Sequence, residues 1–174
     1  GSLIRYDRDQ YTWKSDSSQL LRKKQLRIGS IFFHIGVLFL FFGHFFGMLT
    51  PHFLYDPFIT AGQKQLMAMA SGGIAGVFGF IGLTILLHRR LTDDRIRINS
   101  KPSDILIVVV LWLQLLLGLA TIPLSGQHLD GSVMMQLAGW AQHIATFRGG
   151  AVELLNGVDW VFKLHMFLGM TIFL

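Results

Sequence analysis

An uncharged apolar run from Ile28 to Tyr55 constrains the fold of this chain most, because two histidines, His34 and His44, lie inside it. The run contains no Asp, Glu, Lys or Arg and is long enough to cross a bilayer as one helix. A third histidine, His165, lies in a second uncharged run. An imidazole in hydrocarbon costs several kcal/mol when its nitrogens have no partner, so we expect a metal cofactor between helices to hold these rings.

Composition is typical of a polytopic membrane protein. Hydrophobic residues make up 52% of the 174 residues and charged residues 14%. Cysteine is absent, which excludes disulfides, covalently attached haem, and cysteine-ligated zinc or iron–sulfur clusters in this chain. The net charge of +5 does not indicate a nucleic-acid partner, because the basic residues flank the apolar runs, where a membrane surface is their partner.

Four segments are apolar enough to cross a membrane as helices: residues 29–50, 65–88, 105–123 and 159 onward. We expect Pro51 to end the first, Pro102 to precede the third and Pro123 to close it. The predicted fold class is an all-α polytopic transmembrane helix bundle, with residues 1–174 as one membrane domain. Because both ends of the sequence are apolar, we expect a fragment that lacks an earlier span and the end of the last helix.

The distribution of basic residues predicts the orientation of the spans. Residues 1–28 hold seven lysines and arginines, and residues 89–103 hold five. The intervening 51–64 loop has only Lys64, and the 124–158 loop has only Arg148. By the positive-inside rule, residues 1–28 and 89–103 are predicted to face the cytoplasm.

Glycine is frequent in the first two spans, and two interpretations of it stay open. Gly72 and Gly76 form a small-residue pattern that permits close helix packing. Helix packing would account for most glycines of the two spans, and the alternative is that some of them leave room for a flat macrocycle. The glycines concerned are Gly36, Gly43, Gly47, Gly72, Gly73, Gly76, Gly79 and Gly82.

Helical geometry assigns the three histidines to two levels. His34 and His44 are ten residues apart, which is about 15 Å along a helix axis with an angular offset near 80°, so both can face one bundle interior. His44, seven residues before Pro51, and His165, about six residues into the last span, both lie roughly 9–10 Å below the outer surface. Two imidazoles at one level on two helices suit a bis-histidine haem b, whereas His34 lies near the inner side without a visible partner.

Other interpretations of the histidines are less specific. Each of the three could be a core histidine satisfied by hydrogen bonds. His88, beside Arg89 and Arg90, is predicted to be an interfacial anchor rather than a ligand. The remaining histidines fall in outer loops and are expected to be solvated: His52, His128 and His143.

Several segments carry a resemblance to a known family. They are residues 5–7, 10–13, 33–36, 43–52, 122–128, 139–142 and 164–171. Through them the chain resembles, over essentially its whole length, the cytochrome b (gamma) subunit of membrane-bound respiratory nitrate reductase. This family has five spans and two b haems, so the resemblance implies five spans in the full-length protein, of which four are visible here.

The resemblance implies roles for individual residues. His44 and His165 would ligate the haem nearer the outer face, and His34 would ligate the inner haem, whose second histidine is expected beyond Leu174. Lys64 corresponds to a lysine that the family uses at its quinol site, near the outer haem. A snorkelling interfacial lysine is the alternative interpretation for Lys64.

The resemblance also implies an activity. Quinol would be oxidised near the outer face of a bacterial or archaeal cell membrane, and two b haems would pass the electrons inward. An iron–sulfur beta subunit would receive them, and a molybdenum-containing alpha subunit would reduce nitrate to nitrite. At the inner side, Arg89 and Arg90 would pair with haem propionates or serve as positive-inside anchors. Two rivals stay open: a related diheme cytochrome b of another reductase complex, and a haem-free membrane anchor or transporter bundle.

Overall fold

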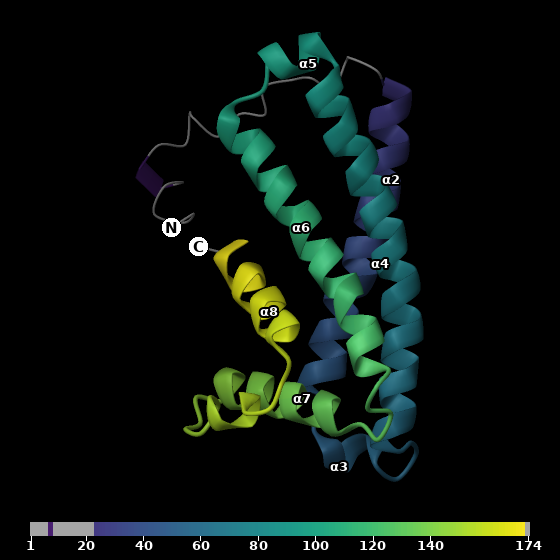
Figure 1. Cartoon of the computed structure of the whole chain (residues 1–174), viewed down its shortest axis with the longest axis vertical. Coiled ribbons are helices and arrows are strands. Elements are labelled where there is room, and N and C mark those ends of the chain that lie inside the picture. The colour runs from purple at the N-terminus through teal and green to yellow at the C-terminus, as the bar shows by residue number, and fades with distance from the viewer. Residues whose placement is uncertain (1–6, 9–22, 173–174) are drawn as a thin grey trace.

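The computed structural model describes residues 7–8 and 23–172, and every regular element within these ranges is helical, as predicted. The longer helices are α2 (Lys23–Leu49), α4 (Ala61–Thr92), α6 (Pro102–Ser125) and α8 (Trp160–Ile172). The shorter ones are α3 (His52–Tyr55), α5 (Asp94–Ile98), α7 (Ser132–Ala145) and the 3-10 helix η2 (Glu153–Leu155). In Figure 1, α2, α4 and α6 run along the long axis of a helix bundle. The short helix α5 lies at one end of the bundle, and α3 and α7 lie at the other.

Three of the predicted spans are confirmed as helices with the length and hydropathy of membrane spans: α2, α4 and α6. Large apolar side chains along α2 are exposed, Phe39 at 68% and Phe46 at 61%, which is the pattern of a surface in contact with lipid or with another apolar helix. The helix α8 has 13 residues, fewer than the roughly 20 that a span requires. The predicted cytoplasmic residues before Lys23, apart from 7–8, lie outside the described part of the chain.

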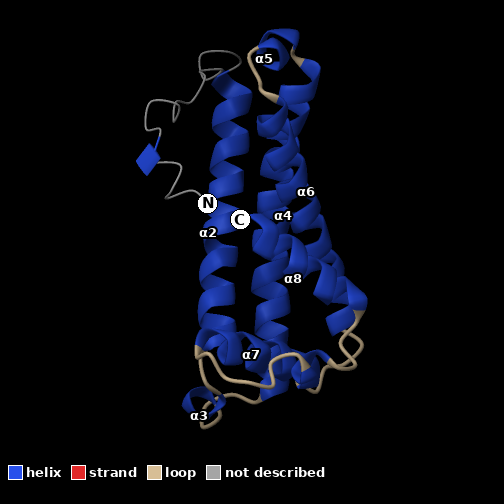
Figure 2. Cartoon of the chain, turned by 90° about the vertical axis from the view of Figure 1, so that its left-hand side faces the viewer, coloured by secondary structure: helices blue, strands red, loops and turns tan. Residues whose placement is uncertain are grey.

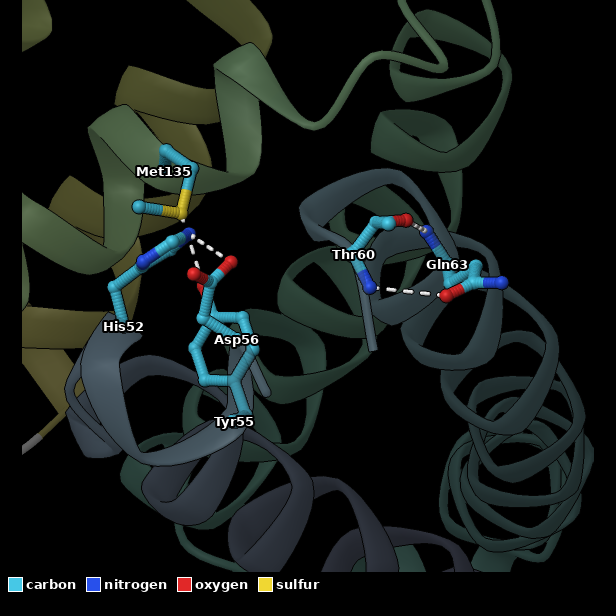
Figure 3. Close-up of polar contacts among 6 residues, drawn as sticks. All are labelled: His52, Tyr55, Asp56, Thr60, Gln63 and Met135. Atoms are coloured by element: carbon cyan, nitrogen blue, oxygen red, sulfur yellow. Dashed lines mark hydrogen bonds and ion pairs between the residues drawn. The ribbon is translucent and has the colours of Figure 1, made fainter. Parts of the chain in front are cut away.

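Several helix ends lie outside the predicted span boundaries. The helix α2 begins at Lys23 rather than at residue 29, α4 ends at Thr92 rather than at residue 88, and α6 begins at Pro102 itself rather than at residue 105. The helix α4 begins at Ala61 rather than at residue 65, because Thr60 and Gln63 form a capping box. Figure 3 shows its two bonds: Thr60 N donates to Gln63 Oε1 at 2.9 Å, and Gln63 N donates to Thr60 Oγ1 at 3.2 Å. Pro123 does not close the third span, since α6 continues to Ser125. A proline in the last turn removes only one backbone hydrogen bond there.

Glycines bring α2 and α4 into close contact over the half of the bundle near α5. A Cβ atom at Gly36 would lie 2.6 Å from the Ala75 carbonyl oxygen, and one at Gly82 would lie 2.7 Å from the Gly29 carbonyl oxygen. Any side chain at these positions would force the helices apart. The packing interpretation is therefore confirmed for this part of the seam.

The same seam opens toward α3 and α7. Gly43 lies seven residues after Gly36 on α2, and Gly72 lies seven residues before Gly79 on α4, so the two continue the row of glycines. A Cβ atom at Gly43, Gly47 or Gly72 would meet no atom within 4 Å. For Gly72 the prediction of close packing was wrong, and the space beside Gly43 adjoins His44.

The helix α7 lies within residues 124–158, which the sequence analysis treated as a loop. It crosses the end of the bundle, as the two views show (Figures 1 and 2). Its Gln142 side chain donates hydrogen bonds to the carbonyls of Met48 at 2.9 Å and Thr50 at 3.3 Å. Carbonyls at a helix C-terminus lack partners within the helix, so Gln142 anchors the end of α2 just beyond His44.

Candidate functional site

The imidazole rings of His44 in α2 and His165 in α8 lie next to each other. Their centroids are 6.4 Å apart and their planes are inclined by 43°. Residues separated by most of the sequence therefore meet at one level of the bundle, as the helical-rise argument predicted.

The hydrogen bond at Nδ1 of each α2 histidine shows which ring nitrogen remains available to bind a metal. His44 Nδ1 lies 2.7 Å from the Leu40 carbonyl oxygen, and His34 Nδ1 lies 2.7 Å from the Ser30 carbonyl oxygen. Because a carbonyl only accepts, Nδ1 carries the proton in both rings. The lone pair then lies on Nε2, and a backbone acceptor behind Nδ1 is the usual support of a metal-binding histidine.

His165 lies in a space that a glycine leaves open. A Cβ atom at Gly118 of α6 would lie 3.0 Å from His165 Cε1 and 3.6 Å from Nε2. The Nδ1 atom of His165 is buried and has no hydrogen bond of good geometry among the described residues, although the Gln114 backbone is near enough to interact with the ring. The site thus contains a buried imidazole that is incompletely satisfied.

The pair fits a centre with two axial imidazoles. Two rings bound to one metal through bonds of about 2 Å place their centroids roughly 6–6.5 Å apart, and the observed separation is 6.4 Å. Within the described residues no cluster of three or more His, Asp or Glu could hold a bare ion. A haem supplies its own equatorial ligands and needs only two from the protein, so haem fits this donor set better than a bare ion.

His34 has no second imidazole beside it within the described ranges. Besides the Ser30 carbonyl, its Nδ1 lies 3.2 Å from Ser30 Oγ, and its ring packs edge-on against Phe33. The described residues therefore place a single imidazole, that of His34, at this level of the bundle.

Lys64 lies in the first turn of α4, at the same end of the bundle as α3 and α7. Its ammonium nitrogen Nζ is 3.7 Å from the centroid of the Tyr55 ring. Nζ is buried and has no hydrogen-bond partner among the described residues. An ammonium in the first turn also opposes the positive end of the helix dipole. Three N–H donors are thus held out of water at a position unfavourable for stability.

Tyr55 links Lys64 to α7. The ring is buried at 9% exposure, and its hydroxyl donates a hydrogen bond of 3.0 Å to Met135 Sδ (Figure 3). Burial, reinforced by the Asp56 carboxylate, raises the pKa of the Tyr55 phenol, so the group stays protonated as a donor. Asp56 itself pairs with His52 Nε2 at 3.4 Å rather than with Lys64.

Arg90 lies at the opposite end of the bundle from Lys64. Its guanidinium donates to the Asp104 carbonyl oxygen at 3.0 Å and so joins α4 to the first turn of α6. The neighbouring Arg89 is almost fully buried at 3% exposure, which the sequence analysis did not predict. Two of the histidines predicted to lie in loops are helical instead, His52 in α3 and His143 in α7, and His143 Nδ1 lies 2.9 Å from the Gly149 carbonyl oxygen.

Sequence reasoning missed Tyr55 and Gly118. Tyr55 comes four residues after Pro51 in a segment that was assigned to a loop. Gly118 is the one glycine within α6, and a lone glycine in so apolar a helix was the available signal for a close contact with a ring.

Comparison with known proteins identifies the family. Residues 1–174 match the family described as nitrate reductase gamma subunit. The chain is 59% identical over 174 residues to the respiratory nitrate reductase 2 gamma chain of Escherichia coli (strain K12), covering 100% of this chain and 77% of that protein. Identity to the respiratory nitrate reductase 1 gamma chain of the same strain is 53%, with the same coverage. Identity to the nitrate reductase gamma chain of Bacillus subtilis (strain 168) is 37%, covering 100% of this chain and 78% of that protein. The chain therefore belongs to the nitrate reductase gamma subunit family, as the resemblance implied.

Proposed function

We propose that this chain is the haem b membrane subunit of a respiratory nitrate reductase: it oxidises quinol near the outer face and delivers the electrons through two haems to cytoplasmic partner subunits. The observation that carries the proposal is the His44–His165 pair, with ring centroids 6.4 Å apart between two helices of an apolar bundle. Membership of the nitrate reductase gamma subunit family supports the assignment of the reductase.

His44 and His165 would hold the outer haem through their Nε2 atoms. The Leu40 carbonyl fixes the tautomer of His44, and the absence of a side chain at Gly118 leaves space for the His165 ring. A haem bound there supplies a one-electron carrier whose potential depends on its ligands and on burial. His34 would hold an inner haem together with a histidine beyond Leu174, and Arg90 would pair with a propionate.

Lys64 would bind the quinol. Its buried, unpaired ammonium can donate to a quinol oxygen and stabilise negative charge that develops as protons leave. A Cβ atom at Gly43, Gly47 or Gly72 would meet no atom within 4 Å, so a flat ring could approach the backbone of α2 and α4 closely at these positions. These positions lie toward the same end of the bundle as Lys64.

The partners follow from the proposed direction of electron flow. With residues 1–28 and 89–103 on the cytoplasmic side of the cell membrane, electrons leaving the inner haem would meet an iron–sulfur beta subunit, and a molybdenum-containing alpha subunit would reduce nitrate. Five basic residues in 89–103 support this orientation.

A spectrum of the purified full-length complex tests the proposed function. We expect two b-type haem signals in the reduced-minus-oxidised absorbance spectrum, and we expect a quinol analogue to reduce both under anaerobic conditions without nitrate. A haem-free membrane anchor would give neither signal. Haems that dithionite reduces but quinol does not would contradict quinol oxidation by this subunit.

Gly118 offers a more local test of the outer site. Gly118→Leu should displace the His165 ring, because even a Cβ atom would lie 3.0 Å from Cε1. We expect the outer haem to be lost or to change its spectrum, with the inner haem retained. Ala120→Leu places the same side chain at an exposed position of α6 and should leave both haem signals unchanged. An unaltered outer haem in Gly118→Leu would contradict the placement of His165.

A further inference from the structure

We infer that Tyr55 is the residue that positions the Lys64 ammonium for its ligand, through a cation–π contact that leaves the ammonium donors free. The inference rests on the proposed quinol site and adds a second residue to it. Tyr55 would act through Lys64, so it is a positioning residue.

The contact geometry supports this role. Lys64 Nζ lies 3.7 Å from the centre of the Tyr55 ring, well within the range of about 6 Å in which a ring face attracts a cation. The lysine side chain is long and flexible, and ordering it costs conformational entropy. A ring that holds Nζ before the ligand arrives removes part of this cost from binding.

The choice of an aromatic partner has a chemical consequence. A carboxylate beside Lys64 would accept its N–H groups and occupy the donors that a ligand needs. A carboxylate is near in sequence, because Asp56 follows Tyr55, but it pairs with His52 at 3.4 Å. The ring face instead stabilises the positive charge without accepting a conventional hydrogen bond. Nζ consequently remains without a hydrogen-bond partner among the described residues, although it is buried.

The position of the Tyr55 ring depends on two helices, α3 and α7. Its backbone belongs to α3, and its hydroxyl donates to Met135 Sδ of α7 at 3.0 Å (Figure 3). The orientation of Lys64 thereby depends on α7, the helix that also anchors the end of α2 through Gln142. Removing the hydroxyl should loosen the ring, whereas removing the ring should release Nζ.

The test uses the full complex with both haems and measures affinity for a hydroxyquinoline N-oxide, a quinol analogue that is not oxidised. We expect Tyr55→Leu to weaken binding roughly 5- to 30-fold and to raise KM for quinol more than it lowers kcat. Tyr55→Phe keeps the ring face and should restore most of the affinity. Phe58→Leu, which removes an 83% exposed aromatic residue nearby, should leave affinity unchanged.

A double-mutant cycle assigns the effect to Lys64. In a Lys64→Met background, Tyr55→Leu should cause no further loss of affinity, because the charge that the ring stabilises is absent. Fully additive effects of the two substitutions would overturn the inference. If Tyr55→Leu does not assemble, fluorinated phenylalanines at position 55 keep the shape while weakening the ring face, and affinity should fall with each added fluorine. Affinity that is independent of fluorination would overturn it.

The two proposals fail differently. If Lys64→Met leaves analogue affinity and quinol kinetics unchanged, the proposed quinol site is wrong. If Lys64→Met weakens both but neither Tyr55→Leu nor fluorination has an effect, the quinol site stands and only the role of Tyr55 is wrong.

Discussion

Replacing either His44 or His165 with leucine should reduce quinol-dependent nitrate reduction by the complex more than about 100-fold. Loss of a group that merely supports a metal ligand costs about 10- to 100-fold, and loss of the ligand itself should cost more. The two rings have centroids 6.4 Å apart, so either substitution would leave the shared haem with one protein ligand. The measurement is nitrate-dependent oxidation of a quinol analogue by purified complex.

A bypass assay supplies the control for both histidine variants. A soluble artificial reductant that delivers electrons directly to the partner subunits should support nitrate reduction at the wild-type rate, because the partner subunits are unaltered. Equal losses of activity in the two assays would mean that the substitutions disrupt assembly of the complex. Quinol-dependent activity close to wild type in either variant would contradict haem ligation by the histidine replaced in that variant.

Lys64→Met should retain both haems and slow their reduction by quinol about 100-fold, the usual cost of removing one well-placed donor from a site of developing charge. Methionine keeps most of the length of the side chain and removes the ammonium, which is buried against Tyr55 without a hydrogen-bond partner among the described residues. Stopped-flow absorbance at matched haem content measures the rate of haem reduction directly.

Lys163 provides the matched control for Lys64. It is an exposed lysine in the first turn of α8, so Lys163→Met removes an interfacial charge without altering the proposed quinol site. Quinol should reduce the haems of the Lys163→Met variant at the wild-type rate. If the haems of Lys64→Met were also reduced at the wild-type rate and only the stability of the complex fell, Lys64 would be an interfacial anchor. It would then not belong to the quinol site.

The features that helical geometry determines could be predicted from the sequence. A fixed rise per residue gave His44 and His165 the same level, and their rings are neighbours in the structure. Uncharged runs likewise located α2, α4 and α6. These predictions required no knowledge of which helices pack together.

The features that depend on tertiary contact could not be predicted in this way. Gly36 and Gly43 are seven residues apart on α2, yet a Cβ atom at Gly36 would collide with α4 whereas one at Gly43 would meet no atom within 4 Å. The sequence pattern is the same at both positions and does not show which of them has a neighbouring helix. The contact of Lys64 with Tyr55 depends on where α3 turns after Pro51.

The sequence does contain a helical pattern in the segment that forms α7, although this segment was predicted to be a loop. Apolar residues at 133, 134, 137, 138 and 141 follow a helical period, and Gly131 with a φ of 85° precedes them. The 14 residues of α7 are too few to span a membrane, so the segment is absent from the predicted spans. The helix contacts both the end of α2 and the ring of Tyr55, so the geometry of the candidate site depends on it.

The most direct test of the account is electron paramagnetic resonance of the oxidised complex in wild type, His44→Leu and His165→Leu. Ferric haem with two imidazole ligands is low-spin, so wild type should show two low-spin signals, one from each haem. Each variant should lose the same low-spin signal and retain the other, because the proposed ligation assigns His44 and His165 to one haem. Loss of different signals in the two variants would contradict the shared site.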